Sequence, residues 1–584
     1  MTHTVDLTLL QPILARYNGR STHNNPRSLL LPLLHEAQAL YGWLPREVQQ
    51  AISRTLRVPE ADIHGVIEFY TMFYNEPTAK RVVRICDGSS CHVQGSDAVM
   101  AAIEEELGLQ PGETNPEETI TYERVPCLGM CEHGPNALDG TKTAGRLTPD
   151  TITDFLEGSY PEPRSKVYGG PFLVLKRIGE VNPLSLTDYE AHGGYQGLRN
   201  ALTMTPEALI SSKKESEILG RGGAMFPLGL KSEFVRNAPG SPAEKHVVVN
   251  ADESEPGTFK DRTLMEEDPF SIIEATTLMG YTVGAANGWI LVRGEYPRSY
   301  ARLQTAVSKA RAAGYLGKDV MGHAGFDFDI EVRLGAGAYI CGEETALFEA
   351  VEGKRGFPRI KPPYPPSQGL FNQPTSINNV ETLVMALAAF NMGHEAWREL
   401  GTEKSPGTKL FCLSGHIAKP GTYEIEFGMT IRDLLDMAGG VPGGKQIQAM
   451  LFGGAAGTFV GPEMLDMPLT YEDAKANGVS LGSGAIVVFD ETAVLRDTLY
   501  QLSHFFAHES CGKCFPCQIG TQRQMEILGR IAHNGGPKST DRNALLDIGF
   551  TMTETSLCGL GQTAASAVMS AMDLWPELVE VSEQ

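Results

Sequence analysis

Eight of the ten cysteines fall into two sets of four whose spacing is typical of metal ligation. The carboxy-terminal set is Cys511, Cys514 and Cys517 in ESCGKCFPC, followed by Cys558 in SLCGLGQT. Three thiolates with two residues between each can bind three corners of a cubane from one turn, while the fourth arrives from a later element. A structural zinc site also uses four thiolates, but more often from two separated C-x-x-C pairs. The spacing therefore favours a [4Fe-4S] cluster over zinc.

The amino-terminal set consists of Cys86 and Cys91, then Cys127 and Cys131 after an interval of 35 residues. Two pairs from two loops suit a [2Fe-2S] rhomb, in which each pair binds one iron. A zinc ion or a redox-active cysteine pair fits the same spacing. The second cysteine set in the same chain favours the cluster.

A glycine-rich segment between the two sets, Gly220 to Lys231 (GRGGAMFPLGLK), is suited to bind a phosphate or a planar ring. Its backbone amides can approach a ligand closely, and Arg221 and Lys231 add positive charge. The segment does not match G-x-G-x-x-G, so it does not predict a standard Rossmann site. Taken alone, such a glycine-rich loop is more often a plain turn than a binding site.

The elements that must position these residues form several units, because 584 residues exceed one hydrophobic core. An apolar stripe from Leu30 to Leu40 predicts a helix that starts near Asn24-Asn25-Pro26, within a helical first unit. After Thr78, a β-rich run leads to Cys86 in a compact α/β unit. The Pro- and Gly-rich stretch from Gly158 to Phe172 predicts a connection between separate cores.

Beyond that connection, HVVVN (246–250) and WILVR (289–293) alternate with helical patterns and predict a largely parallel sheet. From Thr408, two strand patterns around Lys419-Pro420-Gly421 predict a hairpin that leads into a short helix, as in a β-grasp module. From about Arg496 the pattern is helical and carries the second cysteine set.

Composition limits the possible partners and location. The net charge of -22 disfavours nucleic acid and anionic membrane surfaces. The segment from Met1 to Tyr17 lacks the pattern of a secretory signal, and no apolar run reaches the ~18 residues of a membrane span. Cysteines are sparse, and Cys341 and Cys412 are predicted to be inert buried thiols. We therefore expect a cytoplasmic chain with no direct membrane insertion.

Three further runs complete a pattern that resembles a known family. They are NADESEPGTFKDR (250–262), GAGAYICGEETALFEAVEGKRGFPRIKPPYP (335–365) and PTSINNVETL (374–383). With GRGGAMFPLGLK and ESCGKCFPC, they resemble the NADH-binding flavoprotein subunit of respiratory complex I, over about 181–574. Residues 1–157 resemble the separate [2Fe-2S] subunit that lies beside it, a helical part followed by a thioredoxin-like part.

The resemblance implies a multidomain α/β fold. Its parts are a helical region (1–78), a thioredoxin-like [2Fe-2S] domain (79–157), a linker (158–180), an α/β FMN/NADH-binding domain (181–405), a β-grasp (SLBB-like) domain (406–492) and a carboxy-terminal helical bundle with [4Fe-4S] (493–584).

It also implies the site residues. FMN is expected on the loop of Gly220, Arg221, Gly222 and Gly223, with Lys231, Asn250, Asp252, Tyr339, Gly342, Glu343, Asn378 and Asn379 around its ring, ribityl chain and phosphate. NADH is expected over the flavin, with Phe226, Phe234 and Tyr364 near the adenine and with Glu255, Glu344 and Lys361 on the nucleotide. The three aromatic residues could instead belong to the core. No side chain is expected to act as an obligatory acid or base.

Two residues depart from the family pattern. Met225 stands where the family usually has Gly, and Ser232 stands where it usually has Trp, so affinity for flavin or nucleotide is open to change. The acids Glu255 and Glu344 should repel a 2'-phosphate, which favours NAD(H) over NADP(H).

The resemblance predicts an NADH:acceptor oxidoreductase (diaphorase) subunit that exchanges hydride between NAD(H) and FMN and moves single electrons through the clusters. Fusion of the [2Fe-2S] unit to the flavin unit resembles diaphorase subunits of NAD-dependent formate dehydrogenases and NAD-reducing hydrogenases. All four amino-terminal cysteines are present, which favours a molybdenum or tungsten formate dehydrogenase α subunit as the partner. A hydrogenase or a complex I-like enzyme is the alternative. A non-catalytic scaffold held together by two zinc sites is a different class of hypothesis.

Overall fold

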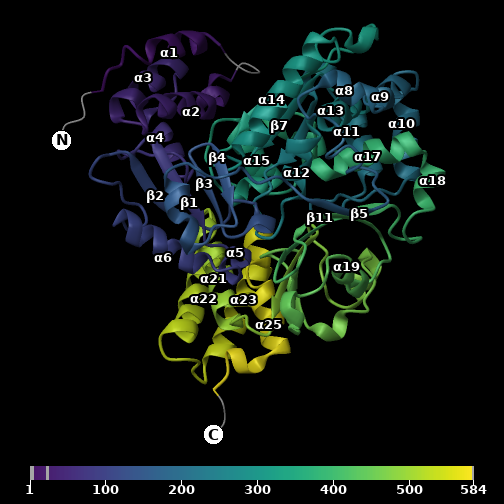
Figure 1. Cartoon of the computed structure of the whole chain (residues 1–584). Helices are drawn as coiled ribbons and strands as arrows, with labels where there is room; N and C mark the ends of the chain where they lie inside the picture. Colours follow the sequence, from purple (N-terminus) through teal and green to yellow (C-terminus); the bar gives the residue numbers. More distant parts are fainter. Residues whose placement is uncertain (1–4, 21–24, 582–584) are drawn as a thin grey trace.

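The computed structural model describes residues 5–20 and 25–581 (Figure 1). The outer ends of the predicted first and last domains, residues 1–4 and 582–584, lie outside the described residues. So does Asn24, at the predicted start of the first helix.

A helical unit forms the amino-terminal part, as predicted. Asn25 accepts a hydrogen bond from the Arg27 amide at the first turn, and Gly42 ends the longest helix with a left-handed φ of 85°. Leu30, Leu33 and Leu34 of the predicted stripe are buried in the core of this unit, and Leu40 is partly buried against it. Its elements are α1 Gln11–Tyr17, η1 Pro26–Leu29, α2 Leu30–Tyr41, α3 Arg46–Leu56 and α4 Glu60–Ile67.

The thioredoxin-like unit has a four-stranded sheet in the order β2-β1-β3-β4, with β1 parallel to β2. Its elements are β1 Arg81–Cys86, α5 Ser89–Val93, α6 Ser96–Leu107, β2 Ile120–Val125, η2 Cys131–His133, β3 Asn136–Asp139, β4 Lys142–Gly145, η3 Pro149–Thr151 and α7 Ile152–Leu156. One cysteine pair lies at and after the end of β1, and the other follows β2. Because the carboxyl ends of parallel neighbours meet at one sheet edge, this topology brings the four cysteines together.

The predicted linker contains a strand, β5 Val167–Gly170. It pairs in parallel with β11 Gly421–Glu426 at the edge of the β-grasp sheet. An exposed sheet edge offers unpaired backbone groups that an extended segment can satisfy. The connection is thereby fixed to a module that follows only after the whole flavin-type domain.

The flavin-type domain has an all-parallel sheet in the order β8-β7-β6-β9, which confirms the predicted parallel α/β architecture. The strands are β6 His246–Ala251, β7 Asn287–Val292, β8 Asp329–Leu334 and β9 Thr375–Asn379. The helices are α8 Leu186–Ala191, α9 Gln196–Ala201, α10 Pro206–Glu215, α11 Leu228–Asn237, α12 Lys260–Glu267, α13 Pro269–Val283, α14 Pro297–Ala312, α15 Glu344–Val351, α16 Pro365–Gln368, α17 Val380–Met392 and α18 His394–Arg398. Short turns η4 Pro242–Glu244, η5 Val320–Gly322, η6 Tyr339–Gly342 and η7 Leu370–Asn372 connect them.

The β-grasp module contributes the other five strands of a six-stranded sheet, and the predicted hairpin through Lys419-Pro420-Gly421 is confirmed. Its elements are β10 Thr408–Gly415, β11, α19 Ile431–Met437, η8 Pro442–Gly444, β12 Ile447–Phe452, β13 Thr458–Val460, η9 Pro462–Met464, α20 Tyr471–Ala476 and β14 Ala485–Asp490.

The carboxy-terminal part is helical, as predicted, and α21 lies beside α5 of the thioredoxin-like unit (Figure 1). Its elements are α21 Leu495–Glu509, α22 Phe515–His533, α23 Asp541–Thr555, α24 Gly559–Thr563, α25 Ser566–Leu574 and η10 Pro576–Leu578. In residues 5–20 and 25–581, none of the helices has both the length and the apolar character that a membrane crossing requires.

Candidate functional site

A cavity of about 470 Å³ opens at the carboxyl ends of β6 and β9. This edge of a parallel sheet is where α/β proteins usually bind ligands, and the volume lies within the usual range for such sites. The cavity is lined by the glycine-rich loop, the carboxyl ends of β6 and β9, the segments after β6 and β8, two loops of the β-grasp module, and α24.

Gly222 and Gly223 of the glycine-rich loop form part of one wall of this cavity. A Cβ at Gly222 would lie 3.1 Å from Cβ of Asn379, and Gly223 has a φ of 110°. The loop is held in place because the Gly220 amide donates to the Phe226 carbonyl at 3.0 Å. The shape fits a planar, phosphate-bearing cofactor such as FMN, since side chains here would fill the space that the cofactor needs.

The side chain of Arg221 turns away from this cavity. Its guanidinium donates to the Tyr471 hydroxyl at 2.8 Å and to the Thr408 carbonyl at 3.1 Å, and it lies 4.9 Å from the ring centre of Phe427. It therefore attaches the loop to the β-grasp module, although sequence reasoning assigned its charge to FMN.

The segment after β6 supplies an amide and two buried acids. Asn250 donates through Nδ2 to the Gly342 carbonyl at 2.8 Å. Glu255 accepts hydrogen bonds from the Tyr339 hydroxyl at 2.5 Å and the Ala456 amide at 2.8 Å. Burial raises the pKa of Asp252 and of Glu255 to about 7. Both acids line the cavity and can carry a proton near neutral pH.

Glu343 also lines the cavity and caps α15 by accepting from the Thr345 and Ala346 amides. Lys361 forms ion pairs with Glu343 at 2.8 Å and with Glu344 at 2.6 Å. Lys361 and Glu344 are not among the lining residues.

The adjacent side chains of Asn378 and Asn379 lie in different environments. Asn379 lines the cavity and donates to Oδ2 of Asp261 at 2.6 Å, whereas Asn378 is buried and donates to the Ser376 hydroxyl at 3.1 Å. A strand directs successive side chains to opposite faces, so only one of the pair can face the cavity.

The predicted nucleotide-contacting aromatics lie on the surface, outside the cavity lining. Phe226, Phe234 and Tyr364 are 41%, 47% and 59% exposed. The alternative that they are core residues is therefore wrong. Lys231 donates to the Ile377 carbonyl at 2.9 Å, with its ammonium group 5.9 Å from the ring centre of Phe226.

Neither family departure lines the cavity. Met225 is 40% exposed and adopts a φ of 52°, a left-handed conformation that favours glycine. Ser232 is buried; its hydroxyl donates to the Leu228 carbonyl at 2.9 Å and lies 3.6 Å from Sδ of Met279.

Sequence reasoning missed part of the lining. Lys260 is fully buried and forms ion pairs with Asp261 at 2.8 Å and Glu381 at 3.0 Å. Its place in NADESEPGTFKDR was the signal that could have identified it. The β-grasp contributions carried no such signal, being ordinary loop residues: Gly453, Ala456, Gly457, Ser480, Gly482 and Ser483.

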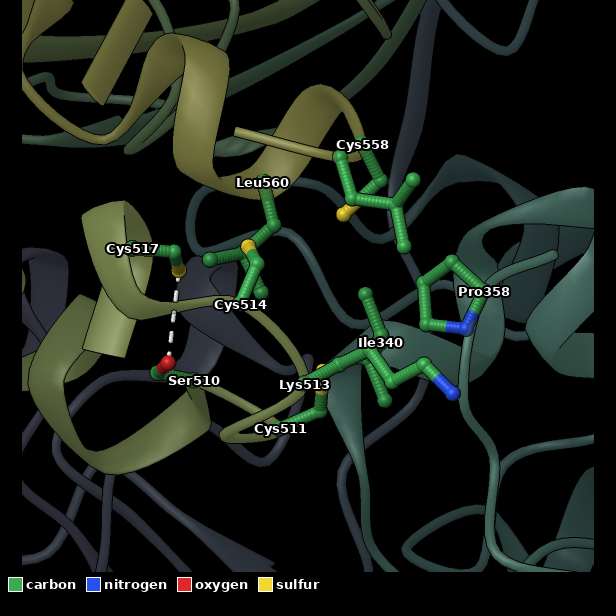
Figure 2. A pocket seen from close by; sticks show the side chains of 10 residues that line it. Ile340, Pro358, Ser510, Cys511, Lys513, Cys514, Cys517, Cys558 and Leu560 are labelled. Carbon is green, nitrogen blue, oxygen red and sulfur yellow. Dashed lines mark hydrogen bonds between the residues drawn. The ribbon is translucent and has the colours of Figure 1, made fainter. Parts of the chain in front are cut away.

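The four carboxy-terminal cysteines line one small cavity together with Ile340, Pro358 and Leu560 (Figure 2). Cys514 and Cys558 each precede the first residue of a helix, and Sγ of Cys517 lies 3.3 Å from the Ser510 hydroxyl. Burial raises the pKa of Cys517 to about 12 and of Cys558 to about 11, so bound metal is what would hold them as thiolates near neutral pH.

In the described part of the chain, no group of His, Cys, Asp and Glu side chains is placed to hold a single metal ion. Separately, three of the four carboxy-terminal thiols come from one short run with two residues between each, a spacing that fits an iron-sulfur cluster better than the zinc alternative.

The small cavity lined by Cys511, Cys514, Cys517 and Cys558, which we call the cysteine cradle, shares a wall with the large cavity. Ile340 and Leu560 line both, and Gly559, directly after Cys558, lines the large cavity. One layer of side chains therefore separates the predicted flavin position from the predicted cubane.

The amino-terminal cysteines are all buried and meet as two pairs. A hydrogen bond with Cys86, together with burial, raises the pKa of Cys91, and the equivalent contact with Cys127 raises the pKa of Cys131. Asn136 Nδ2 donates to Sγ of Cys91 at 3.1 Å, and the Gly129 amide donates to Sγ of Cys127 at 3.3 Å. Paired thiols with donors directed at sulfur fit a [2Fe-2S] cluster.

Comparison with known proteins identifies each part. The chain matches the thioredoxin-like [2Fe-2S] ferredoxin over 10–159, the Nuo51 FMN-binding domain over 213–387, the SLBB domain over 410–455 and the NADH-ubiquinone oxidoreductase-F iron-sulfur binding region over 497–582. These matches confirm the predicted architecture and the cofactor set of FMN, NAD(H), one [2Fe-2S] and one [4Fe-4S] cluster. The scaffold hypothesis is wrong.

Curated relatives and a solved structure agree. The chain is 44% identical to the F subunit of the NADH-quinone oxidoreductase of Streptomyces coelicolor over 68% of this chain and 87% of that one. It is 33% identical to the NAD-reducing hydrogenase HoxS subunit alpha of Cupriavidus necator over 96% and 92%. A crystal structure of an NAD+-reducing [NiFe]-hydrogenase in the H2-reduced state superposes with a TM-score of 0.85 at 29% identity, covering 96% of this chain and 93% of that one. The chain therefore belongs to the family of FMN- and iron-sulfur-dependent NADH dehydrogenase (diaphorase) subunits of larger redox complexes, with the thioredoxin-like [2Fe-2S] unit fused to its flavoprotein part.

Proposed function

We propose that this chain exchanges electrons between NAD(H) and the catalytic subunit of a molybdenum or tungsten formate dehydrogenase. The observation that carries the electron-transfer part is the shared wall of Ile340 and Leu560, because it places a flavin-sized cavity directly beside a four-cysteine cradle. Electron transfer between two cofactors requires this kind of proximity, whichever partner lies beyond the second one.

When bound, FMN accepts a hydride from NADH and releases its electrons singly. The work of the protein is to bind and orient. Backbone at Gly222 and Gly223 provides close approach, Asn250 and Asn379 supply amides, and Tyr339 and Glu255 form one hydrogen-bonded edge of the cavity. These roles follow from position and residue type, and no side chain acts as an obligatory acid or base.

Two observations concern the enzyme to which this subunit belongs, and they favour different candidates. The family resemblance implies that a complete set of amino-terminal cysteines is more typical of the formate dehydrogenase, and Cys86, Cys91, Cys127 and Cys131 are all present. The full-length similarity to the NAD-reducing hydrogenase subunit supports a hydrogenase as the second candidate.

Purification of the native complex and metal analysis of the co-purifying subunit tests the parent enzyme. We expect molybdenum or tungsten and formate-dependent NAD+ reduction; nickel and hydrogen-dependent reduction would establish the second candidate instead. The isolated chain should reduce ferricyanide or viologen dyes with NADH but oxidise neither formate nor hydrogen, because no part of it is expected to hold those metals. Formate oxidation by the isolated chain would contradict the proposal.

Nucleotide preference provides a separate prediction. Glu255→Gln should raise the ratio of kcat/KM for NADPH to that for NADH on the order of tenfold, which corresponds to about 1.4 kcal/mol less repulsion between this side chain and the 2'-phosphate. Burial raises the pKa of Glu255 to about 7, so its carboxylate becomes neutral as pH falls through that value. The ratio should therefore rise at lower pH in the parent chain and change less in the variant.

The variant also serves as the control for the pH dependence, because titration of the 2'-phosphate itself is common to both proteins. Equal pH profiles in the parent and in Glu255→Gln would show that Glu255 does not face this part of the nucleotide.

A further inference from the structure

We propose that the flavin domain forms part of the electrostatic environment of the [2Fe-2S] cluster, and that Arg293 raises the reduction potential of that cluster. The inference rests on the proposed assignment of Cys86, Cys91, Cys127 and Cys131 as its ligands. Arg293 belongs to the flavin domain and lies far beyond the last of these cysteines in the sequence, so its role depends on how the fused units dock.

Arg293 connects residues 127–131, which we call the cluster loop, to the large cavity proposed to bind FMN (the flavin cavity). It follows the last residue of β7 and is only 4% exposed. Its Nη2 donates to the Cys127 carbonyl at 2.8 Å, and its Nη1 donates to the Glu253 carbonyl at 2.8 Å. Because Glu253 lines the large cavity, one guanidinium contacts both a proposed cluster ligand and the loop beside the flavin.

At this point side chains of the flavin domain contact the backbone of the [2Fe-2S] unit directly. Gly129, between the cysteines of the second pair, has a φ of 63°, and a Cβ on it would lie 2.0 Å from the Tyr296 hydroxyl oxygen. The Gly129 carbonyl accepts from Nε of Arg262 at 3.0 Å and from the Tyr296 hydroxyl at 3.3 Å. The cluster loop is therefore shielded from water by flavin-domain groups.

Two guanidinium groups face this loop, and their charges are compensated differently. Arg262 forms ion pairs with Glu132 and with Glu266, both of which are buried. Arg293 forms an ion pair with Glu295 at 3.0 Å, and its guanidinium carbon lies 5.0 Å from the ring centre of Tyr296. Since Arg262 is shared by two carboxylates, Arg293 is the cation whose loss should change the local potential more.

Reduction adds one electron, and so one negative charge, to the cluster. A buried cation near the sulfurs and donors directed at the ligand backbone stabilise that charge, and both raise the potential. No bond or proton of Arg293 changes in the step. Its contribution is a constant field that favours the reduced form, which makes it a positioning residue rather than a catalytic one.

The test is an EPR-monitored redox titration of the full chain with dithionite and mediators. In Arg293→Gln we expect the oxidised-to-reduced ratio of the [2Fe-2S] signal at a given potential to rise about tenfold, which corresponds to a midpoint about 59 mV lower for one electron. The [4Fe-4S] midpoint should not move, and Arg293→Lys should stay closer to the parent. Arg81→Gln is the matched control, because it removes the ion pair with Asp139 at the far end of β1.

Glu295→Gln gives the opposite sign and remains informative even if Arg293→Gln loses its cluster. Removing this carboxylate should raise the [2Fe-2S] midpoint, an effect that a purely structural role does not predict. An intact signal with the parent midpoint in Arg293→Gln, or an unchanged or lower midpoint in Glu295→Gln, overturns the inference. A parent chain with no [2Fe-2S] signal overturns the ligand assignment as well, so the two failures are distinguishable.

Discussion

Cys514→Ala should abolish electron transfer from NADH to the partner subunit while leaving NADH:ferricyanide activity largely intact. Cys514 lies at the amino-terminal end of α22 and lines the cysteine cradle, but it does not line the flavin cavity. Removing it takes one thiolate from the cubane without altering the shared wall. We expect reduction of the partner to fall by more than about 100-fold, since loss of even an outer partner of a metal ligand costs about 10–100-fold.

The measurement is EPR of the dithionite-reduced complex, with iron analysis and both assays on the same sample. Cys412→Ala is the matched control, because Cys412 is also buried but lies outside both cavities. The control should keep the full [4Fe-4S] signal. An undiminished signal in Cys514→Ala would remove this residue from the ligand set, and zinc without iron in the parent would reject the cluster.

Cys558→Ala should behave differently, and the comparison tests the shared wall. The residues directly after Cys558, Gly559 and Leu560, line the flavin cavity. Because Cys558 itself belongs to this turn, its substitution should change the position of Gly559 and Leu560 and lower ferricyanide activity too. Cys514→Ala does not alter this turn directly and should spare that activity. Equal ferricyanide activities in the two variants would mean that the two sites are structurally independent.

The sequence predicted best those features that depend on spacing or on strand and helix patterns. The cysteine sets, the parallel sheet and the hairpin at Lys419-Pro420-Gly421 follow from local patterns that the tertiary fold preserves. In contrast, the orientation of Arg221 depends on the β-grasp module, with which it forms hydrogen bonds through Tyr471 and Thr408. A positive charge in a glycine-rich loop does not reveal whether the side chain faces the ligand or the neighbouring domain.

Contacts between the domains were the other feature that could not be predicted from the sequence. The strand β5 forms because β11 presents a free edge, and its sequence, VYGG, has little strand character of its own. The buried Lys260 is stabilised by Asp261 next to it and by Glu381, which belongs to a distant segment of the chain. Such positions become meaningful only when the segments that surround them are known.

Arg262→Met should weaken the docking of the [2Fe-2S] unit on the flavin domain by about 3–5 kcal/mol, the usual cost of removing one partner from a buried ion pair. Arg262 is 1% exposed, forms an ion pair with the buried Glu132, and donates to the Gly129 carbonyl at 3.0 Å. In the variant, the buried Glu132 carboxylate loses its ion pair with Arg262. Hydrogen exchange in residues 127–133 and limited proteolysis within 158–166 should both become faster.

The size of this effect depends on burial, which a matched surface variant can show. Arg432→Met removes an ion pair with Asp466, in which both side chains are about half or more exposed, so its effect on stability should be much smaller than that of Arg262→Met. The double variant Arg262→Met with Glu132→Gln should regain part of the loss, because no unpaired charge remains at that position. Equal exchange rates in Arg262→Met and Arg432→Met would mean that the apolar and backbone contacts hold the unit alone. Faster exchange that the double variant partly reverses would instead show that the buried pair fixes the cluster loop against the domain that carries the flavin.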